Sequence, residues 1–260
     1  MNASALDVLA IAAHRDDVEQ TCGGTLLKAA QRGQRTGILD LTRGELGTRG
    51  TADDREREAV DAAKILGVSW RGALDIPDGR VENTYENRLK VAYVIRLTRP
   101  RVVILPYWKG RHPDHYTCSM LGYEACFLAG LTKLDLSSVS ESSLHLNLTT
   151  DHWQRTAKLL PQRPFKILYA TLYYDVRPTF VIDISQQFEG KLKSILAYKS
   201  QFSDQQAGAD IFPAAAEIRT RVESMARFYG MLAGVDHAEP FLQKEVGLVE
   251  DLTAIPVKSI

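Results

Sequence analysis

Two short segments of the sequence set histidines beside carboxylates. They are Ala13-His14-Arg15-Asp16-Asp17-Val18-Glu19 and Arg111-His112-Pro113-Asp114-His115. Imidazole and carboxylate groups ligate zinc and iron in proteins, and they also serve as general acids and bases. Each segment follows an apolar run, so each stands where a buried strand would end. These two segments are therefore the candidates for metal-binding or acid–base chemistry.

Part of each segment has a purely structural explanation. Asp17 suits the N-cap of a helix that follows a strand. Pro113 suits the first position of a helix, and Asp114 suits the positive end of the helix dipole. Neither explanation accounts for His14 and Asp16, nor for the two histidines of the second segment.

The elements that must position these residues follow an alternating pattern. Strand-like runs are each followed by a helical pattern: Val8–Ala13 by Val18–Arg32, Thr36–Leu41 by Asp53–Leu66, Gly72–Ile76 by Tyr85–Thr98, and Arg101–Leu105 by Asp114–Ala129. Such alternation predicts βαβ units and a parallel sheet. The strand-like runs are continuously apolar, as strands covered on both faces should be.

The sequence therefore predicts a Rossmann-like, doubly wound α/β fold with a mostly parallel sheet and helices on both faces. Two further strands and two further helices are expected at Phe165–Leu172, Thr179–Ile184, Gln186–Tyr198 and Pro213–Tyr229. No repeat or linker divides the chain, so one domain over residues 1–260 is expected. Its segment at about 135–160 is rich in Ser, Thr and Asn and is expected to be an inserted loop.

The first and fourth strands of such a sheet are commonly neighbours across the switch point, so the two histidine segments should close on each other. His14, Asp17 and His115 would then give three protein ligands and leave positions open for water, as a catalytic zinc ion requires. Two histidines and one carboxylate could equally hold ferrous iron.

The remaining polar residues of the two segments can then be assigned catalytic roles. Asp16 would stand beside a water on the metal as a general base, and this spare base favours hydrolysis over oxygen chemistry. His112 would be an acid or electrophilic group, with Asp114 fixing its tautomer.

Composition excludes several other classes of protein. The chain has 260 residues with 32 Lys plus Arg and 32 Asp plus Glu, so it lacks the charge that binding to nucleic acid or an anionic membrane usually needs. Its three cysteines form no Cys-x-x-Cys pair, which argues against a disulfide framework and fits the cytoplasm. The early apolar run Ala5–Ala13 carries Asp7 and has no basic region before it, so it predicts neither a signal peptide nor a membrane span.

Two other enzyme classes lack their motif. The glycines at 44, 47 and 50 fit neither the dinucleotide-binding nor the P-loop spacing. No Gly-x-Ser-x-Gly elbow occurs, so a serine esterase would lack its nucleophile.

The two segments resemble the signatures A-H-x-D-D and H-P-D-H of the LmbE-like or PIG-L deacetylases. The resemblance continues through Gly23-Gly24-Thr25, Leu41 to Gly47, Arg55 with Glu58, Asp78, Ala129-Gly130-Leu131, Asp183-Ile184-Ser185 and Tyr198 to Phe202. It implies a zinc ion on His14, Asp17 and His115, with Asp16 as base and His112 with Asp114 as acid or oxyanion pair.

The same resemblance implies a substrate and further contacts. The expected reaction removes the acetyl group from an N-acetylglucosamine conjugate, and the nearest branch is the bacillithiol-biosynthesis enzyme that acts on N-acetylglucosaminyl malate. Arg55 and Asp78 match positions that contact the sugar, and Arg163 matches an arginine near the substrate. Homo-oligomers, often hexamers, are expected from the family.

Alternatives stay open at this point. The substrate could be another N-acetylglucosamine glycoside, either a mycothiol precursor or a chitobiose end, and a metal-free sugar-binding module would need the metal or base positions to be lost. Two residues depart from the pattern of close relatives. Arg15 stands where proline or alanine is usual, and His237 stands where tyrosine is usual.

Overall fold

The computed structural model describes residues 5–139, 144–145, 159–171, 176–202 and 215–257. Within them the strands form one eight-stranded sheet in the order β5-β3-β2-β1-β4-β6-β8-β7. The central strands β3, β2, β1, β4 and β6 run parallel, whereas β5 and β8 run antiparallel to their neighbours. The strand bounds are β1 Val8–Ala12, β2 Thr36–Asp40, β3 Trp70–Leu74, β4 Val102–Pro106, β5 Leu144–His145, β6 Lys166–Ala170, β7 Phe180–Asp183 and β8 Ala238–Gln243.

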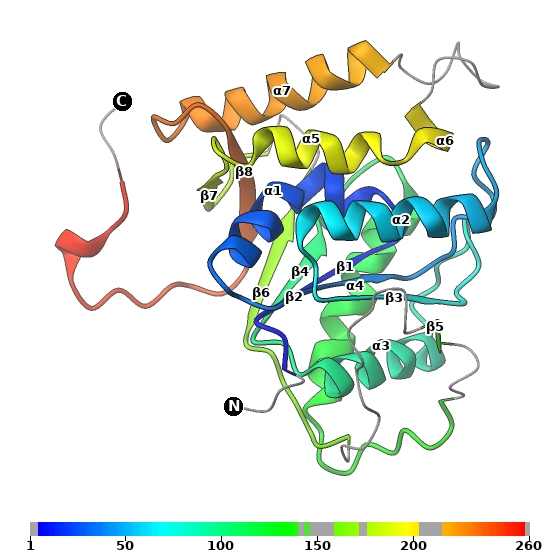
Figure 1. Cartoon of the computed structure of the whole chain (residues 1–260). Coiled ribbons are helices and arrows are strands. Elements are labelled where there is room, and N and C mark those ends of the chain that lie inside the picture. Colours follow the sequence, from blue (N-terminus) through cyan, green and yellow to red (C-terminus); the bar gives the residue numbers. More distant parts are fainter. Residues whose placement is uncertain (1–4, 140–143, 146–158, 172–175, 203–214, 258–260) are drawn as a thin grey trace.

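Helices cover both faces of this sheet. Helices α3 and α4 pack together on one face, and α1, α2, α5 and α7 lie on the other, as Figure 1 shows. The helix bounds are α1 Asp17–Gln31, α2 Ala52–Leu66, α3 Tyr85–Thr98, α4 Pro113–Ala129, α5 Phe188–Leu196, α6 Lys199–Phe202 and α7 Ala215–Met231, followed after β8 by the short 3-10 turn η2 at Leu252–Ala254. In the part of the chain that the structure describes, no helix is both long and apolar enough to span a bilayer.

Because helices cover both faces of the sheet, its central strands are apolar throughout. Successive side chains of a strand point to opposite faces. Along β1, Leu9 and Ile11 join the core under α3 and α4, whereas Ala10 and Ala12 join the core under α1. Every residue of β2 and β3 is buried.

The predicted α/β fold is confirmed, and the first and fourth strands are neighbours, with Leu9 opposite Val103. Strand β8 was missed because Pro240 and Glu239 interrupt its apolar run. The Glu239 carboxylate is buried and accepts hydrogen bonds from the backbone of Gly24 and from Lys191, so its charge is compensated inside the fold. Of the expected inserted loop at about 135–160, residues 135–139, 144–145 and 159–160 are described, whereas residues 140–143 and 146–158 lie outside the described residues.

Candidate active site and metal centre

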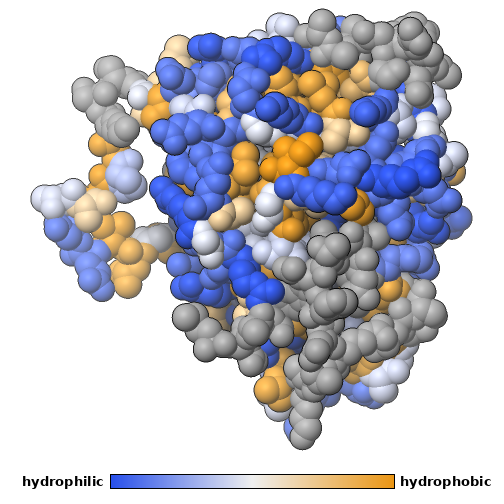
Figure 2. All heavy atoms as spheres, viewed as in Figure 1, coloured by the Kyte–Doolittle hydropathy of each residue, from blue (hydrophilic) through white to orange (hydrophobic). Residues whose placement is uncertain are grey.

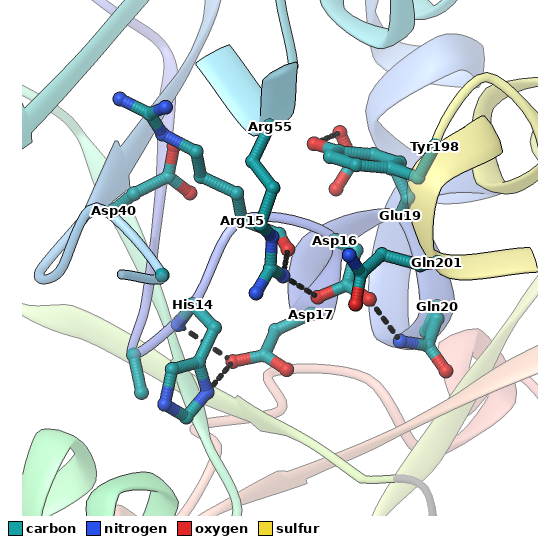
Figure 3. Close-up of polar contacts among 12 residues, drawn as sticks. His14, Arg15, Asp16, Asp17, Glu19, Gln20, Asp40, Arg55, Tyr198 and Gln201 are labelled. Carbon is teal, nitrogen blue, oxygen red and sulfur yellow. Dashed lines mark hydrogen bonds and ion pairs between the residues drawn. The ribbon is translucent and has the colours of Figure 1, made fainter. Parts of the chain in front are cut away.

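The turn between β1 and α1 aims two adjacent carboxylates in different directions. Asp16 is the residue before α1 and has φ 105°, a left-handed conformation that costs a non-glycine residue on the order of 1–3 kcal/mol. The Asp17 carboxylate turns back and accepts the backbone N–H of His14 at 2.9 Å. The Asp16 carboxylate points the other way, to Gln20 and Arg55, as Figure 3 shows. Asp16, rather than Asp17, therefore occupies the N-cap position.

His14, Asp17 and His115 converge on one point. The His14 Nδ1 atom lies 3.2 Å from His115 Nε2 and 3.4 Å from Asp17 Oδ2. His115 Nε2 lies 3.2 Å from Asp17 Oδ1. Tetrahedral ligands at zinc bond lengths of about 2.0–2.1 Å are roughly 3.3 Å apart, so these three side chains already have the spacing of a ligand set.

The second nitrogen of His14 faces two other carboxylates. His14 Nε2 lies 3.1 Å from Asp78 Oδ1 and 3.1 Å from Asp114 Oδ2. Backbone N–H groups fix both acids, because Gly79 and Val81 donate to Asp114 and Leu46 donates to Asp78. This is the arrangement in which carboxylates orient a metal-binding histidine from behind. When the ring is neutral, these carboxylates favour the tautomer with hydrogen on Nε2, which makes Nδ1 the atom available as a ligand.

Two further groupings of ligand atoms within 4.8 Å of one another share His14. One adds Asp78 and Asp114, and the other adds His112 and His115. In the first, both carboxylates already accept backbone hydrogen bonds and face the Nε2 atom. In the second, the rings of His112 and His115 stack at 4.8 Å between centroids, and His112 is exposed. The structure thus offers a candidate metal centre around His14.

The charges of the cluster fit a divalent cation. Burial lowers the pKa of His14, but hydrogen bonds to Asp114, Asp17 and Asp78 outweigh it and raise the pKa to about 12. Burial would raise the pKa of Asp17, yet His115 and His14 hold it well below the usual range. An imidazole surrounded by three carboxylates is a place where additional positive charge is strongly stabilised.

Asp16 and Arg55 form a separate pair beside this cluster. Burial raises the pKa of Asp16 to about 7, although the Arg55 guanidinium acts to lower it. Arg55 donates to Asp16 Oδ1 at 3.2 Å and to the carbonyl oxygen of Arg15 at 2.5 Å. A glycine is required beside it, because a Cβ atom on Gly44 would lie 2.7 Å from Arg55 Nη1, and Gly44 has φ 71°. Arg55 was expected to contact a sugar. In the structure it donates a hydrogen bond to the Asp16 carboxylate.

His112 takes its tautomer from the backbone. It is the residue before α4, and its Nδ1 atom accepts the N–H of Asp114 at 3.3 Å, which leaves Nε2 as the donor of the neutral ring. Partial burial and the neighbouring His14 and His115 lower the pKa of His112. Asp114 thus acts on this tautomer through its backbone N–H, whereas its carboxylate is directed to His14.

Arg163 lies elsewhere. It precedes β6, which runs parallel to β1 and β4, whereas His14 and His115 follow the latter two strands, so Arg163 is at the opposite edge of the sheet. Its guanidinium stacks on the ring of Phe127 at 4.5 Å. The expected contact between Arg163 and a substrate in this site is therefore not supported by its position.

The two residues that depart from the family pattern also point away from the cluster. Arg15 is fully buried and donates to the carbonyl oxygen of Ala52 and to Glu56, so it joins the loop to α2. His237 stacks on Phe188 with 4.3 Å between ring centroids. Neither residue adds a group to the site.

Sequence reasoning missed a second buried network just behind the site. Arg71 of β3 donates to both carboxylate oxygens of Asp40 and to Glu19, and the Tyr198 hydroxyl also donates to Glu19. All four side chains are fully buried. The available signal was an arginine inside an otherwise apolar strand, which needs a buried partner.

A parallel sheet that gathers histidines and carboxylates at the ends of neighbouring strands defines an α/β protein with a candidate metal centre at its switch point. The chain belongs to the PIG-L family. The model of that family, GlcNAc-PI de-N-acetylase, matches residues 9–126. The diacetylchitobiose deacetylase of Thermococcus kodakarensis is 30% identical over 89% of this chain and 80% of its own length.

Solved structures of similar proteins cover nearly the whole chain. The conserved protein TT1542 of Thermus thermophilus is 37% identical with a TM-score of 0.77, over 94% of this chain and 98% of its own. The N,N'-diacetylchitobiose deacetylase of Pyrococcus horikoshii, in complex with an inhibitor, is 25% identical with a TM-score of 0.71, over 90% of this chain and 82% of its own.

Proposed function

We propose that this protein is a metal-dependent amide hydrolase that removes the acetyl group from an N-acetylglucosamine conjugate, releasing acetate and a free amine. The observation that carries the proposal is the triangle of His14 Nδ1, His115 Nε2 and the Asp17 carboxylate, with sides of 3.2–3.4 Å. The family match and the similarity to diacetylchitobiose deacetylases support this reaction.

His14, Asp17 and His115 are the residues that would hold the metal, with zinc expected and ferrous iron as the alternative. A divalent ion supplies Lewis acidity, which polarises an amide carbonyl and lowers the pKa of water. Asp78 and Asp114 orient His14 from its other nitrogen, as carboxylates behind metal-binding histidines do.

Asp16 and His112 are the groups that move or share protons in this proposal. Asp16 accepts a proton from the attacking water, while Arg55 and Gln20 hold its carboxylate in place. When the C–N bond breaks, Asp16 or His112 donates a proton to the leaving amine nitrogen. The neutral His112 ring, with Nδ1 occupied by the Asp114 N–H, presents Nε2–H to the developing charge on the carbonyl oxygen.

A small pocket beside the ligand triangle supports acetyl as the acyl group. It has a volume of about 30 Å³ and borders Asp17 and His115. Its other walls are largely apolar and come from the ends of β1, β4 and β6 and the start of α1, including Val18, Ile104 and Ala170. Its largely apolar walls suit a methyl group.

The conjugate attached to the sugar is the finer question. N-acetylglucosaminyl malate, predicted from the resemblance, carries two carboxylates and needs cations near the site. Three arginines that follow β2 already have partners within the chain: Arg43 pairs with Asp53, Arg49 donates to the carbonyl oxygen of Gln201, and Arg55 donates to Asp16. The relative from Thermococcus favours a chitobiose-like glycoside instead.

Acetate release and metal analysis together test the proposal. Wild-type protein should bind one divalent ion per chain and deacetylate diacetylchitobiose, N-acetylglucosaminyl malate or both, faster than free N-acetylglucosamine. Protein with bound metal that releases no acetate from any of the three sugars would refute the proposed substrate class. The ratio of the two kcat/KM values then assigns the conjugate.

A further inference from the structure

Helix α1 is broken shortly after it begins. Cys22 has φ −138° and ψ 19°, which is not a helical conformation, and Gly23 and Gly24 follow it. Glycine weakens the interior of a helix, so the sequence favours a break at this point. The break leaves residues 17–21, called here the first turn of α1, as a separate piece. So short a piece is not stable as an isolated helix, and contacts with other elements must therefore fix its direction.

The first turn of α1 carries groups of the proposed site. Asp17 is its first residue, and Asp16 directly precedes it. The Gln20 side chain donates to the Asp16 carboxylate at 3.3 Å, as Figure 3 shows. The Thr21 hydroxyl donates to the carbonyl oxygen of Asp17 at 2.8 Å. A change in the direction of this turn would therefore displace the proposed base and a proposed metal ligand together.

A buried ion pair engages the backbone on both sides of the break. The Lys191 ammonium lies 2.6 Å from the Glu239 carboxylate and also donates to the carbonyl oxygen of Gln20 at 2.8 Å. Glu239 accepts the backbone N–H groups of Gly24 at 2.9 Å and Thr25 at 2.7 Å. In a regular α-helix the N–H of Gly24 would donate to the carbonyl oxygen of Gln20. The ion pair therefore binds both the donor and the acceptor of one helical hydrogen bond, at the point where the helix breaks.

The surrounding elements bring the pair to this point. Lys191 belongs to α5, which packs on α1, and Glu239 belongs to β8, which also contacts α1 (Figure 1). A Cβ atom on Gly24 would lie 3.1 Å from Glu239 Oε1 and 2.9 Å from Ile184 Cδ1. Glycine at this position thus lets the carboxylate reach the backbone of α1.

The burial of this pair carries a cost that surface charges avoid. Figure 2 shows hydrophilic residues spread over the face of the molecule in that view, where their charges stay in water. The Lys191 and Glu239 side chains, by contrast, are 5% and 2% exposed. Replacing a buried ion pair by apolar residues is often neutral or stabilising, so fold stability alone does not account for these charges. Control of the backbone direction at the break does account for them.

The neighbouring Arg71 network reaches the first turn of α1 in a different way. Arg71 and Tyr198 bind the Glu19 carboxylate, which is the end of a long side chain. Lys191 instead binds a backbone carbonyl group of the first turn, so its hydrogen bond constrains the direction of the chain itself.

We propose that Lys191 and Glu239 are positioning residues of the active site, a role that rests on the proposed function. Their bonds on either side of the break set the direction of the first turn of α1. That direction places Asp16 to act as the base and Asp17 to act as a metal ligand. Both positioning residues act through the backbone of α1.

Zinc titration of the apo-protein tests this role separately from catalysis. Lys191→Met keeps the apolar stem but loses the hydrogen bond to Gln20, so zinc affinity should fall about tenfold, as it does for other residues that support metal ligands. Amide hydrogen exchange in the first turn of α1 should become faster. In the zinc-loaded enzyme, kcat for acetate release should fall while KM changes little, because the displaced groups act in the reaction step.

Arg96→Met is the matched control for loss of a buried cation. Arg96 is also buried, but its guanidinium donates to the carbonyl oxygens of Ala129 and Leu131, at the opposite end of α4 from His115. This variant should lose stability and retain the zinc affinity of the wild type. The variant Lys191→Met/Glu239→Met removes both charges of the pair, so neither is left buried without compensation. It should fold and still bind zinc about tenfold more weakly than the wild type.

The outcomes separate this inference from the proposed function. Wild-type zinc affinity and kcat in the folded Lys191→Met and double variants would overturn the positioning role. An equal loss of zinc affinity in the Arg96→Met protein would overturn it as well, because the effect would then follow stability. A wild-type protein that binds no zinc would refute the proposed function, and the positioning role with it.

Discussion

Two buried charged clusters lie side by side on this sheet and differ in where their positive charge comes from. In the cluster around Arg71, the guanidinium binds both oxygens of Asp40 and one of Glu19, so the cation is part of the chain. In the cluster around His14, the carboxylates of Asp17, Asp78 and Asp114 surround one imidazole. The first cluster is closed by its own side chains, whereas the second is suited to an ion from solution.

The difference separates acidic residues that stabilise the fold from those that bind. Taking charges out of water is expensive, and only good geometry offsets the cost. Arg71 meets this condition with a bidentate contact to Asp40 at 2.9 and 3.1 Å. The His14 cluster sets three carboxylates around one imidazole, and a divalent cation bound there would compensate them further. Substitutions in the Arg71 cluster should therefore lower stability and leave metal binding unchanged, whereas substitutions in the His14 cluster should lower metal binding.

The largest effect is expected at the proposed metal ligands. His115→Ala removes one corner of the triangle, so the protein should lose its divalent ion and its turnover should fall to background. His145→Ala is the matched control, because that histidine bonds to Asp75 outside the cluster. Metal content by mass spectrometry and acetate release measure the two effects. Full metal content in the His115→Ala protein would contradict the assigned ligand set.

Asp16→Asn should leave the metal in place and slow the reaction. The amide keeps the shape of the carboxylate but cannot accept the proton, and removing a general base typically costs about 10²–10⁴ in rate. Arg55→Lys should have a smaller effect, since it keeps a positive charge near Asp16 while losing the guanidinium fork. Acetate release under single-turnover conditions isolates the chemical step. Wild-type rates in the Asp16→Asn protein would remove Asp16 from the mechanism.

How much of this site could be predicted from the sequence depends on how far apart in the chain the contacting residues lie. The convergence of His14 and His115 was predictable, because both follow strands that a doubly wound sheet makes neighbours. The direction of the Asp114 carboxylate was not, because the N–H groups of Gly79 and Val81, more than thirty residues away, determine it. The hydrogen bond from Arg55 to Asp16 was likewise not predictable, because it requires α2 to pack against the β1–α1 turn.

The fold was more predictable than the site for the same reason. Helix α3 begins and ends where its pattern predicts, at Tyr85 and Thr98. Strand β8 was not predicted because a glutamate such as Glu239 is usually exposed. Its burial depends on the ion pair with Lys191, a residue far away in the sequence. Local patterns therefore predict elements well, whereas buried polar contacts between distant segments decide the details.

Within the closed cluster, Arg71→Met should destabilise the fold and spare the metal. Removing one partner of a buried ion pair leaves the other charges buried without compensation, which lowers the free energy of unfolding by about 3–5 kcal/mol. Chemical denaturation measures this loss, and metal content per folded chain should equal that of the wild type. Arg57→Met on the exposed side of α2 is the control, with little change in stability expected. Loss of metal from folded Arg71→Met protein would show that the two clusters are one functional unit.

The smallest effect tests which nitrogen of His14 would bind the proposed metal. If Asp78 orients His14 through Nε2, then Asp78→Asn weakens that contact without removing a ligand, and metal affinity or activity should fall by about 10–100-fold. If Asp78 were itself a ligand, the loss would match that of His115→Ala. Asp75→Asn is the matched control, because Asp75 lies three residues earlier and bonds to His145 instead. Titration of the apo-protein with zinc distinguishes the cases, since a graded shift in affinity supports the orienting role and complete loss of binding moves the metal to the Nε2 side of His14.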